Sequence, residues 1–172
     1  MHTRETGDHA MAQYIVGLIL STLSGWTFAL PEDRDQPIEI NADSAVINEK
    51  ENRARYEGAV VVTQGTLKLN GDVVDLSTNE SGEVDSFVAT GGPARFENLR
   101  RQTDAEPVRG RASKIEYSYD TDLVVLTGNA EITTEDSQFA GPEITYALES
   151  GEVVASGSRS DRVNMTMQPK RQ

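Results

Sequence analysis

The sequence of 172 residues contains no cysteine, which excludes disulfide bonds, thiolate nucleophiles, Cys-ligated metal sites and a lipid-modified N-terminal cysteine. Histidine occurs only as His2 and His9, and the single tryptophan is Trp26. A histidine-dependent serine triad or a Cys–His pair therefore cannot be built from the rest of the chain. Asp120 and Asp122 could suggest a metal site, but they lack the further ligands of a calcium loop. We expect neither a cofactor nor a metal.

Basic residues are also scarce, with 16 Lys and Arg against 28 Asp and Glu, so the formal net charge is −12. This charge argues against nucleic-acid binding, which needs clustered cations. The one locally basic stretch contains Arg95, Arg100, Arg101, Arg109, Arg111 and Lys114. Arginine forks suit phosphate groups, but surface clusters of this kind usually form ordinary ion pairs. We favour pairing with Asp104 and Glu106.

Long hydrophobic runs are limited to residues 14–30, which are short for a membrane span and diluted by Ser, Thr and Gly. The run ends in Thr27-Phe28-Ala29, a small-x-small cleavage pattern, although Arg4 is the only basic residue before it. We interpret residues 1–29 as a cleaved secretory signal peptide and residues 30–172 as a single domain with a short polar tail. An uncleaved anchor and a buried core helix are the alternatives.

The remainder of the chain is rich in short runs that alternate apolar and polar residues, such as residues 38–42 and 115–119. Turn signals separate these runs, among them Gln64-Gly65 and Asn70-Gly71, which we interpret as hairpin turns. The sequence Gly91-Gly92-Pro93 is interpreted as a break between strands. This pattern predicts an antiparallel all-β sheet, jelly roll or barrel in which each strand has one apolar and one wet face.

The chain also contains a weak internal repeat at an offset of seventy residues. The aligned pairs are Pro37 and Pro107, Ala42 and Ala112, Gly58 and Gly128, Thr63 and Thr133, and Gly71 and Gly141. Shared turn and strand residues at one offset suggest two related β units in series. Chance alignment is the alternative, because these residue types are common in β proteins.

Four sequence blocks carry a resemblance to a known family: DQPIEI at residues 35–40, EGAVVVTQGTLKLNGD at 57–72, GGPARF at 91–96 and VVLTGNA at 124–130. With these blocks, the chain resembles the OstA-like family of periplasmic lipopolysaccharide transport proteins. The resemblance extends over about residues 35–168. The resemblance implies a twisted antiparallel β-jellyroll that is open at both ends and has an apolar interior groove. It also implies that lipid A acyl chains lie inside this groove while the sugars remain outside.

The resemblance further implies where lipid and protein partners bind. The family's lipid-contact positions fall on Ile38, Ile40, Phe96, Tyr117 and Tyr119, and strand alternation adds Leu67 and Leu69 to the groove wall. A tyrosine hydroxyl such as that of Tyr119 would need a hydrogen-bond partner inside the groove.

Members of the family stack head to tail by pairing edge strands, so the resemblance implies a homo-oligomer. The edge positions in this chain are Ile38, Ile40, Val163, Met165 and Met167. These strands lack the dense charge that normally blocks strand addition. The family's partners are LptC at the inner membrane and LptD at the outer membrane, which implies a location in the periplasm of a Gram-negative bacterium.

Two other functions remain open at this point. The first is a monomeric periplasmic lipid or glycan carrier of the same fold. The second is a carbohydrate-active β-jellyroll enzyme that uses two carboxylates. Most Asp and Glu residues lie at turns or on the polar side of strands, so we expect a protein without enzymatic activity.

Overall fold

The computed structural model describes residues 33–99, 104 and 106–168. These residues belong to one compact part of the chain, Pro31–Gln172. The predicted signal peptide, residues 1–29, lies outside the described residues. Within the described ranges, no helix is both long enough and apolar enough to cross a membrane.

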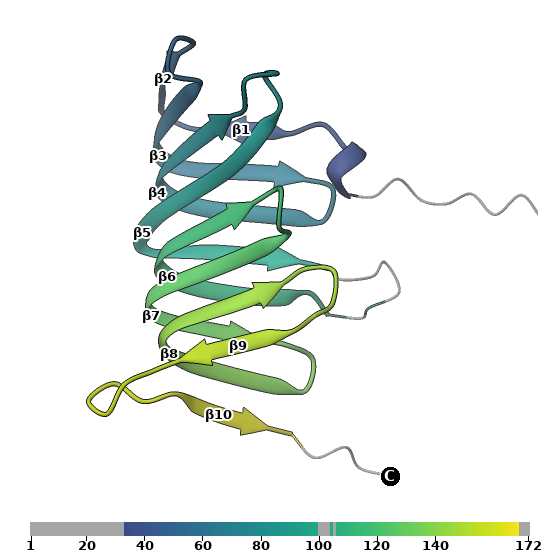
Figure 1. Cartoon of the computed structure of the whole chain (residues 1–172), viewed down its shortest axis with the longest axis vertical. Coiled ribbons are helices and arrows are strands. Elements are labelled where there is room, and N and C mark those ends of the chain that lie inside the picture. Colours follow the sequence, from purple (N-terminus) through teal and green to yellow (C-terminus); the bar gives the residue numbers. More distant parts are fainter. Residues whose placement is uncertain (1–32, 100–103, 105, 169–172) are drawn as a thin grey trace, which may run out of the picture. The chain divides into compact units, whose positions relative to one another are not determined.

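The described chain is almost entirely antiparallel β-sheet, as predicted (Figure 1). A short 3-10 helix, η1 (Asp33–Asp35), precedes ten strands that share one sheet. The strands are β1 (Glu39–Asn41), β2 (Ser44–Asn48), β3 (Arg53–Gln64), β4 (Leu67–Thr78), β5 (Val84–Asn98), β6 (Val108–Ser118), β7 (Leu123–Thr133), β8 (Ser137–Ala147), β9 (Val153–Ser156) and β10 (Asn164–Met167).

The sheet is open and does not close into a barrel. Its order is β1-β3-β4-β5-β6-β7-β8-β10, with β2 pairing along the other half of β3 and β9 along the other half of β8. The two ends of the sheet are therefore formed by β1 with β2 and by β9 with β10. Among the described strands, these two ends do not pair with each other.

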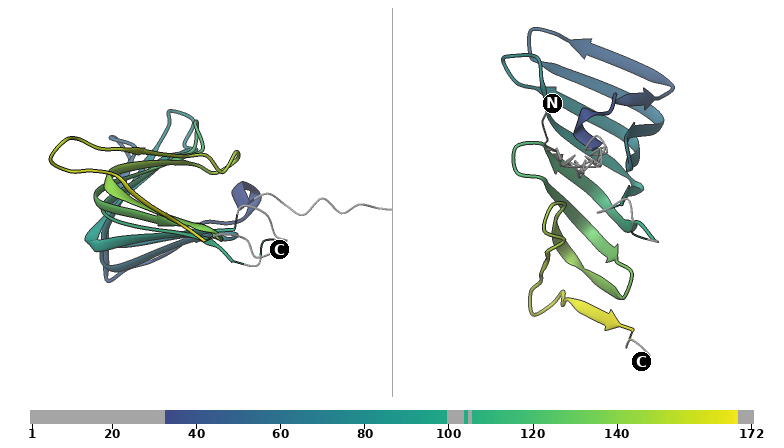
Figure 2. Two further views of the ribbon diagram at one scale, coloured as in Figure 1. Left: turned by 90° about the horizontal axis from the view of Figure 1, so that it is seen from below. Right: turned by 90° about the vertical axis from the view of Figure 1, so that its right-hand side faces the viewer.

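The long strands bend near their midpoints, so the sheet folds into two facing layers (Figure 2). The β1 layer runs from β1 to β10, and the β2 layer runs from β2 to β9. Each bend coincides with a shift of pairing register, for example between Glu57 and Val60 in β3 and between Thr127 and Ala130 in β7. Such irregularities increase strand twist and curvature. We call the open side opposite the bends the mouth.

The predicted turn at Asn70-Gly71 and the predicted break at Gly91-Gly92-Pro93 were wrong, because these residues form bends inside continuous strands. Asn70-Gly71 lies within β4, and Gly91-Gly92-Pro93 lies within β5. Gly71 is required by a close approach and not by a positive φ: a Cβ there would lie 2.8 Å from the carbonyl oxygen of Thr90. The predicted turn at Gln64-Gly65 is confirmed, since Gly65 has a φ of 57° between β3 and β4.

The strand pairing confirms the seventy-residue repeat. Strand β6 is the counterpart of β1 and β2 together, β7 of β3, and β8 of β4. Pairings that recur with this offset are Glu39–Thr63 with Arg109–Thr133, Ser44–Glu57 with Lys114–Thr127, and Arg53–Ser77 with Leu123–Ala147. In the second unit, β9 and β10 pair along β8 as the two halves of β5 pair along β4.

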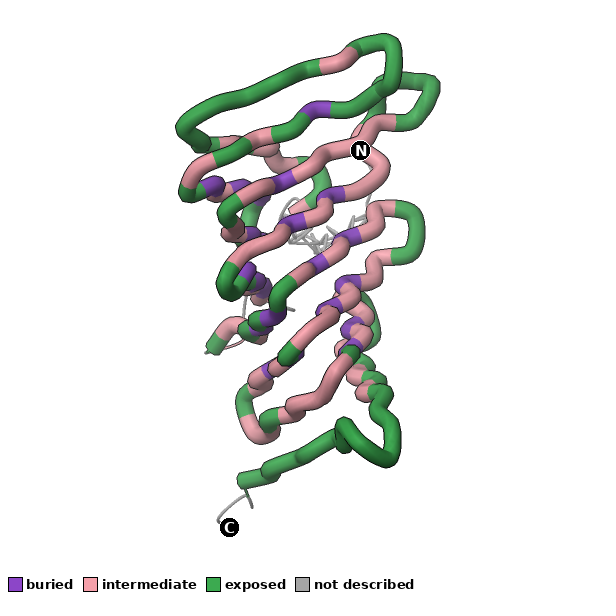
Figure 3. Tube along the Cα trace, turned by 90° about the vertical axis from the view of Figure 1, so that its left-hand side faces the viewer, coloured by how far each residue is buried: buried purple, intermediate pink, exposed green. Residues whose placement is uncertain are grey.

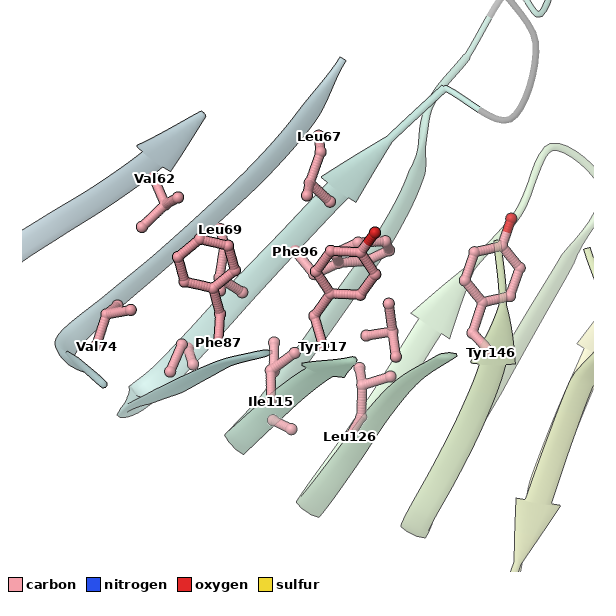
Figure 4. Close-up of a cluster of buried hydrophobic side chains, with 14 of the residues drawn as sticks. Val62, Leu67, Leu69, Val74, Phe87, Phe96, Ile115, Tyr117, Leu126 and Tyr146 are labelled. Atoms are coloured by element: carbon pink, nitrogen blue, oxygen red, sulfur yellow. The ribbon is translucent and has the colours of Figure 1, made fainter. Parts of the chain in front are cut away.

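The core lies between the two layers, where apolar side chains from both layers face one another (Figure 4). The bends explain how both halves of a strand can face this space. In β4 the buried residues are Leu67 and Leu69 before the bend and Val74 after it, so the alternation changes from odd to even positions. Without this shift, one half of the strand would direct its apolar side chains into solvent.

Candidate functional site

The structure brings all seven predicted lipid-contact residues into one apolar cluster between the layers. Leu67, Leu69, Phe96 and Tyr117 are buried in it. Ile38, Ile40 and Tyr119 are half-buried and pack against the same cluster. Figure 4 labels four of the seven, Leu67, Leu69, Phe96 and Tyr117, whose side chains extend into the same interior.

Aromatic contacts connect residues of different strands inside the cluster. The ring centroids of Phe96 and Tyr146 lie 6.2 Å apart in an edge-on arrangement. Tyr119 contacts Tyr117 at 4.9 Å and Phe87 at 6.0 Å. Phe87 and Tyr146 were not among the seven predicted residues. The alternating run at residues 144–148 was the signal that could have identified Tyr146.

The Tyr119 hydroxyl has the hydrogen-bond partner that we expected it to need inside the groove. It donates a hydrogen bond to the side-chain oxygen of Gln64. Gln64 is 4% exposed and lies at the end of β3, on the opposite layer from Tyr119. Burial raises the pKa of Tyr119 and of Tyr117, and the nearby carboxylate of Asp122 raises the pKa of Tyr117 further. Both hydroxyls are therefore neutral donors at physiological pH.

The mouth contains a cavity of about 430 Å³ at the level of the second unit, which we call the mouth cavity. Val108, Phe139, Tyr146 and Val153 provide its apolar lining. Its polar lining consists of Asp104, Glu106, Thr134, Glu135, Asp136, Ser137 and Gly151. Most of the lining is polar, and its apolar side chains form the part of the wall that an apolar chain could contact. The described residues hold no group of three His, Asp or Glu side chains that could bind a metal ion.

Three residues of the basic stretch form ion pairs. Arg109 pairs with Glu106 at 3.3 Å, as predicted, and Arg111 pairs with Glu131 at 2.6 Å. The hydrogen bond from Arg111 to Glu131 raises the arginine pKa. Lys114 pairs with Glu116 at 2.6 Å. Arg100 and Arg101 lie outside the described residues.

Figure 3 shows exposed residues at both ends of the sheet. The large exposed apolar residues of the described chain lie in or next to the strands at these ends. The predicted edge residues Val163, Met165 and Met167 are exposed, whereas Ile38 and Ile40 are half-buried. The prediction omitted three more exposed apolar residues at the ends: Val46, Ile47 and Val154. The run Ala45-Val46-Ile47 was visible in the sequence, but its position on an edge strand was not.

Comparisons with known proteins identify relatives with the same arrangement. Residues 39–152 match a family described as "LptA/(LptD N-terminal domain) LPS transport protein". The lipopolysaccharide export system protein LptH of Pseudomonas aeruginosa is 34% identical over 91% of this chain and 93% of its own length. Its counterpart LptA of Escherichia coli K12 is 38% identical over 83% of this chain and 76% of its own length.

A solved structure shows that the fold is shared as well. The crystal structure of P. aeruginosa LptH superposes with a TM-score of 0.75 at 32% identity, covering 81% of this chain and all of that one. That protein is described as the LptA-homologous periplasmic component of the lipopolysaccharide transport device.

Proposed function

The chain belongs to the LptA/LptD N-terminal-domain family of lipopolysaccharide transport proteins, and from this premise we propose that it carries lipopolysaccharide across the periplasm of a Gram-negative bacterium. The observation that carries the proposal is the open sheet of two facing apolar layers, which ends in a cavity at the mouth. The protein acts as a carrier and not as an enzyme. Its seven interior residues form the wall that lipid A acyl chains contact.

The energetics of acyl-chain burial favour a partly open groove. Burial of each CH₂ group contributes about 0.8 kcal/mol, so complete burial of a chain of about ten methylenes would contribute roughly 8 kcal/mol. Several fully buried chains would bind too tightly to move onward. A groove with an open mouth covers the chains in part and leaves the sugars in water, which allows passage between neighbouring carriers.

The repeat supports a head-to-tail homo-oligomer as the transporting form. Within the chain, β5 of the first unit pairs with β6 of the second. The counterpart of β5 is β9 with β10, and the counterpart of β6 is β1 with β2. The free ends of the sheet are thus the two halves of a joint that the chain already forms internally. We propose that LptC at the inner membrane and LptD at the outer membrane occupy the terminal edges of such a stack.

The proposal also includes export with cleavage after Ala29, which leaves residues 30–172 as a single domain. Sequencing the N-terminus of the exported protein tests this step, and a mature protein that retained residues 14–30 would overturn it. In that case the protein would be anchored, although the sheet could still carry lipid.

Photo-crosslinking in cells tests lipid carriage directly. We would place benzoylphenylalanine at Phe139 or Val153, which line the mouth cavity, and at Tyr119 in the interior. Glu116 is the matched control position. It lies in β6 between Ile115 and Tyr117, which are buried in the interior, so its own side chain points outward. We expect adducts with radiolabelled lipopolysaccharide from the interior positions only. Absence of an adduct from all three would overturn the proposal.

A further inference from the structure

The segment at residues 33–36, which we call the strap, lies at the mouth and contacts both layers (Figure 2). On the β1 layer, the carboxylate of Asp33 accepts hydrogen bonds from the backbone N–H of Thr66 at 2.9 Å and from the side-chain amide of Asn98 at 3.1 Å. The side-chain amide of Gln64 donates to the backbone oxygens of Arg34 and Gln36, both at 3.0 Å.

The same segment reaches the β2 layer through one arginine. The Arg34 guanidinium forms an ion pair of 2.5 Å with Asp122 and donates a hydrogen bond to the backbone oxygen of Tyr119. It also lies over the Tyr119 ring, 5.6 Å from the centroid. Asp33 and Arg34 are adjacent in sequence but bind opposite layers, so the strap ties the two sides of the mouth together.

The strap is held almost entirely by polar contacts. The helix η1 contributes no buried residue, and the Arg34 side chain is 40% exposed. The contacts that Arg34 makes to the β2 layer at such exposure contribute little net stability, because water replaces each one when it breaks. Segments without buried apolar side chains open locally at much lower free energy than a packed sheet. The strap can therefore detach while the two layers remain folded.

The repeat places a cavity at the equivalent level of the second unit. The strap binds Gln64 and Thr66 at the β3–β4 turn of the first unit. Their counterparts seventy residues later are Thr134 and Asp136 at the β7–β8 turn, and both line the mouth cavity. The residues seventy positions after Arg34 and Gln36 are Asp104 and Glu106, and both border this cavity, whereas the strap itself contacts both layers.

We infer that the strap is a releasable closure of the first unit's mouth, which is displaced when the acyl chains of an amphiphile enter there. This inference rests on the proposed function, because it takes lipopolysaccharide as the entering molecule. A protein that binds ligand only after opening has an apparent dissociation constant raised in proportion to its closed fraction. Weakening the strap then strengthens lipid binding.

The first test compares two arginine variants in a titration with fluorescent lipopolysaccharide. Arg34→Ala removes the contacts to the β2 layer, and we expect the apparent dissociation constant to fall about three- to tenfold. Arg55→Ala is the matched control, because Arg55 also bonds two carboxylates, Glu57 and Asp75, but lies away from the mouth contacts. An unchanged or weaker affinity for Arg34→Ala would overturn the inference.

The second test observes the strap itself. Because the chain has no cysteine, the double variant Asp35→Cys and Glu80→Cys carries two unique spin labels, one on the strap and one on the β4–β5 turn. Lipopolysaccharide should lengthen and broaden the distance distribution between them. The control pair Glu80→Cys and Glu149→Cys reports on the sheet and should change little.

The two tests separate failure of this inference from failure of the proposed function. Lipid binding with an unchanged strap distance would overturn the closure and leave carriage intact. If neither the natural protein nor any variant bound lipopolysaccharide, carriage and lipid-driven release would both be overturned. If Arg34→Ala lengthened the distance between the labels at positions 35 and 80 without lipid, the strap would still be shown to connect the two layers through Arg34.

Discussion

Phe96 lies beside Gly110 of the neighbouring strand, where the Leu126 side chain occupies the space that a Cβ would need. A Cβ at Gly110 would lie 2.7 Å from the Leu126 side chain and 3.4 Å from the Phe96 ring. Phe96 is 1% exposed, and its ring contacts Tyr146 edge-on. A predicted lipid-contact residue is therefore also a core residue, and lipid binding and folding stability depend on the same side chain.

This double role gives a stability prediction for Phe96→Ala. Truncating a buried phenylalanine costs about 3–5 kcal/mol, because transfer energy is lost and a cavity remains. Urea unfolding should show a lower midpoint with a similar slope. Val46→Ala, at a position that is 69% exposed, should change the free energy of unfolding by less than about 0.5 kcal/mol. Equal effects of the two variants would show that Phe96 is not packed as described.

The buried tyrosines predict how stability depends on pH. The folded state raises the pKa of Tyr119, chiefly by burial, while the unfolded chain loses this proton near the ordinary value of 10.0. The neutral hydroxyl therefore contributes its full stabilisation below about pH 10, and the contribution is lost as the pH rises further. Tyr119→Phe should make this alkaline decline shallower, with Tyr117 responsible for part of the remainder. Urea unfolding between pH 8 and 11.5 would measure it; identical declines would contradict the prediction.

At the scale of the elements, the bends are built from two different devices. In β3 and β7, consecutive residues with positive φ form the bend: Gly58 with Ala59 and Gly128 with Asn129. In β4, Gly71 instead allows the backbone of β5 to approach closely. Both devices use the residue types that also make turns.

This shared chemistry explains which strand boundaries the sequence could predict. The hairpin turn at Gln64-Gly65 was predicted correctly, whereas Asn70-Gly71 was not. A turn and a bend have similar local sequence signals. In a turn the two flanking segments pair with each other, whereas in a bend both flanking segments pair with the same neighbouring strand. In β4, Lys68 and Val73 both pair with β5, on opposite sides of the bend. That distinction is a property of the sheet and is not contained in a short window of sequence.

Two glycines with the same φ allow strain and crowding to be separated. Gly82 and Gly128 both have a φ of 81°. A Cβ at Gly82 would have no atom within 4 Å, but at Gly128 it would lie 3.0 Å from the Ser113 hydroxyl oxygen. Gly82→Ala should cost about 1–2 kcal/mol from backbone strain alone. Gly128→Ala should cost more, as measured by thermal or urea unfolding; a smaller cost at Gly128 would contradict this account of the bend.

At the scale of the whole described chain, the seventy-residue repeat allows strand pairing in one half to be derived from strand pairing in the other. The family resemblance identified five of the seven residues that the structure brings into one cluster, and strand alternation identified the other two, Leu67 and Leu69. Neither signal could identify the rest of what the mouth contains. The strap could not be identified, because Asp33 and Arg34 have no periodicity and their partners lie between 30 and 90 residues away in the chain. The sequence also could not show that β9 and β10 together reproduce β5, because their offsets from β5 differ along β8.

The internal β5–β6 joint predicts the register of the joint between two copies. Phe96 pairs with both Leu69 and Gly110, and Met165 pairs with the counterpart of Leu69, which is Phe139. Met165 of one copy should therefore lie opposite Ile40 of the next, since Ile40 is the counterpart of Gly110. By the same mapping, Asn164 should lie opposite Asn41, and Val154 opposite Val46.

Disulfide trapping can test this register because the natural chain has no cysteine. One chain would carry Asn41→Cys and the other Asn164→Cys, and mild oxidation of the mixture should give a covalent heterodimer whose yield rises with protein concentration. Thr166→Cys, two residues farther along the same exposed face of β10, is the matched off-register variant and should crosslink less to Asn41→Cys. Equal yields from both pairs would indicate random collision, and no dimer at any concentration would favour a monomeric carrier over the stacked form.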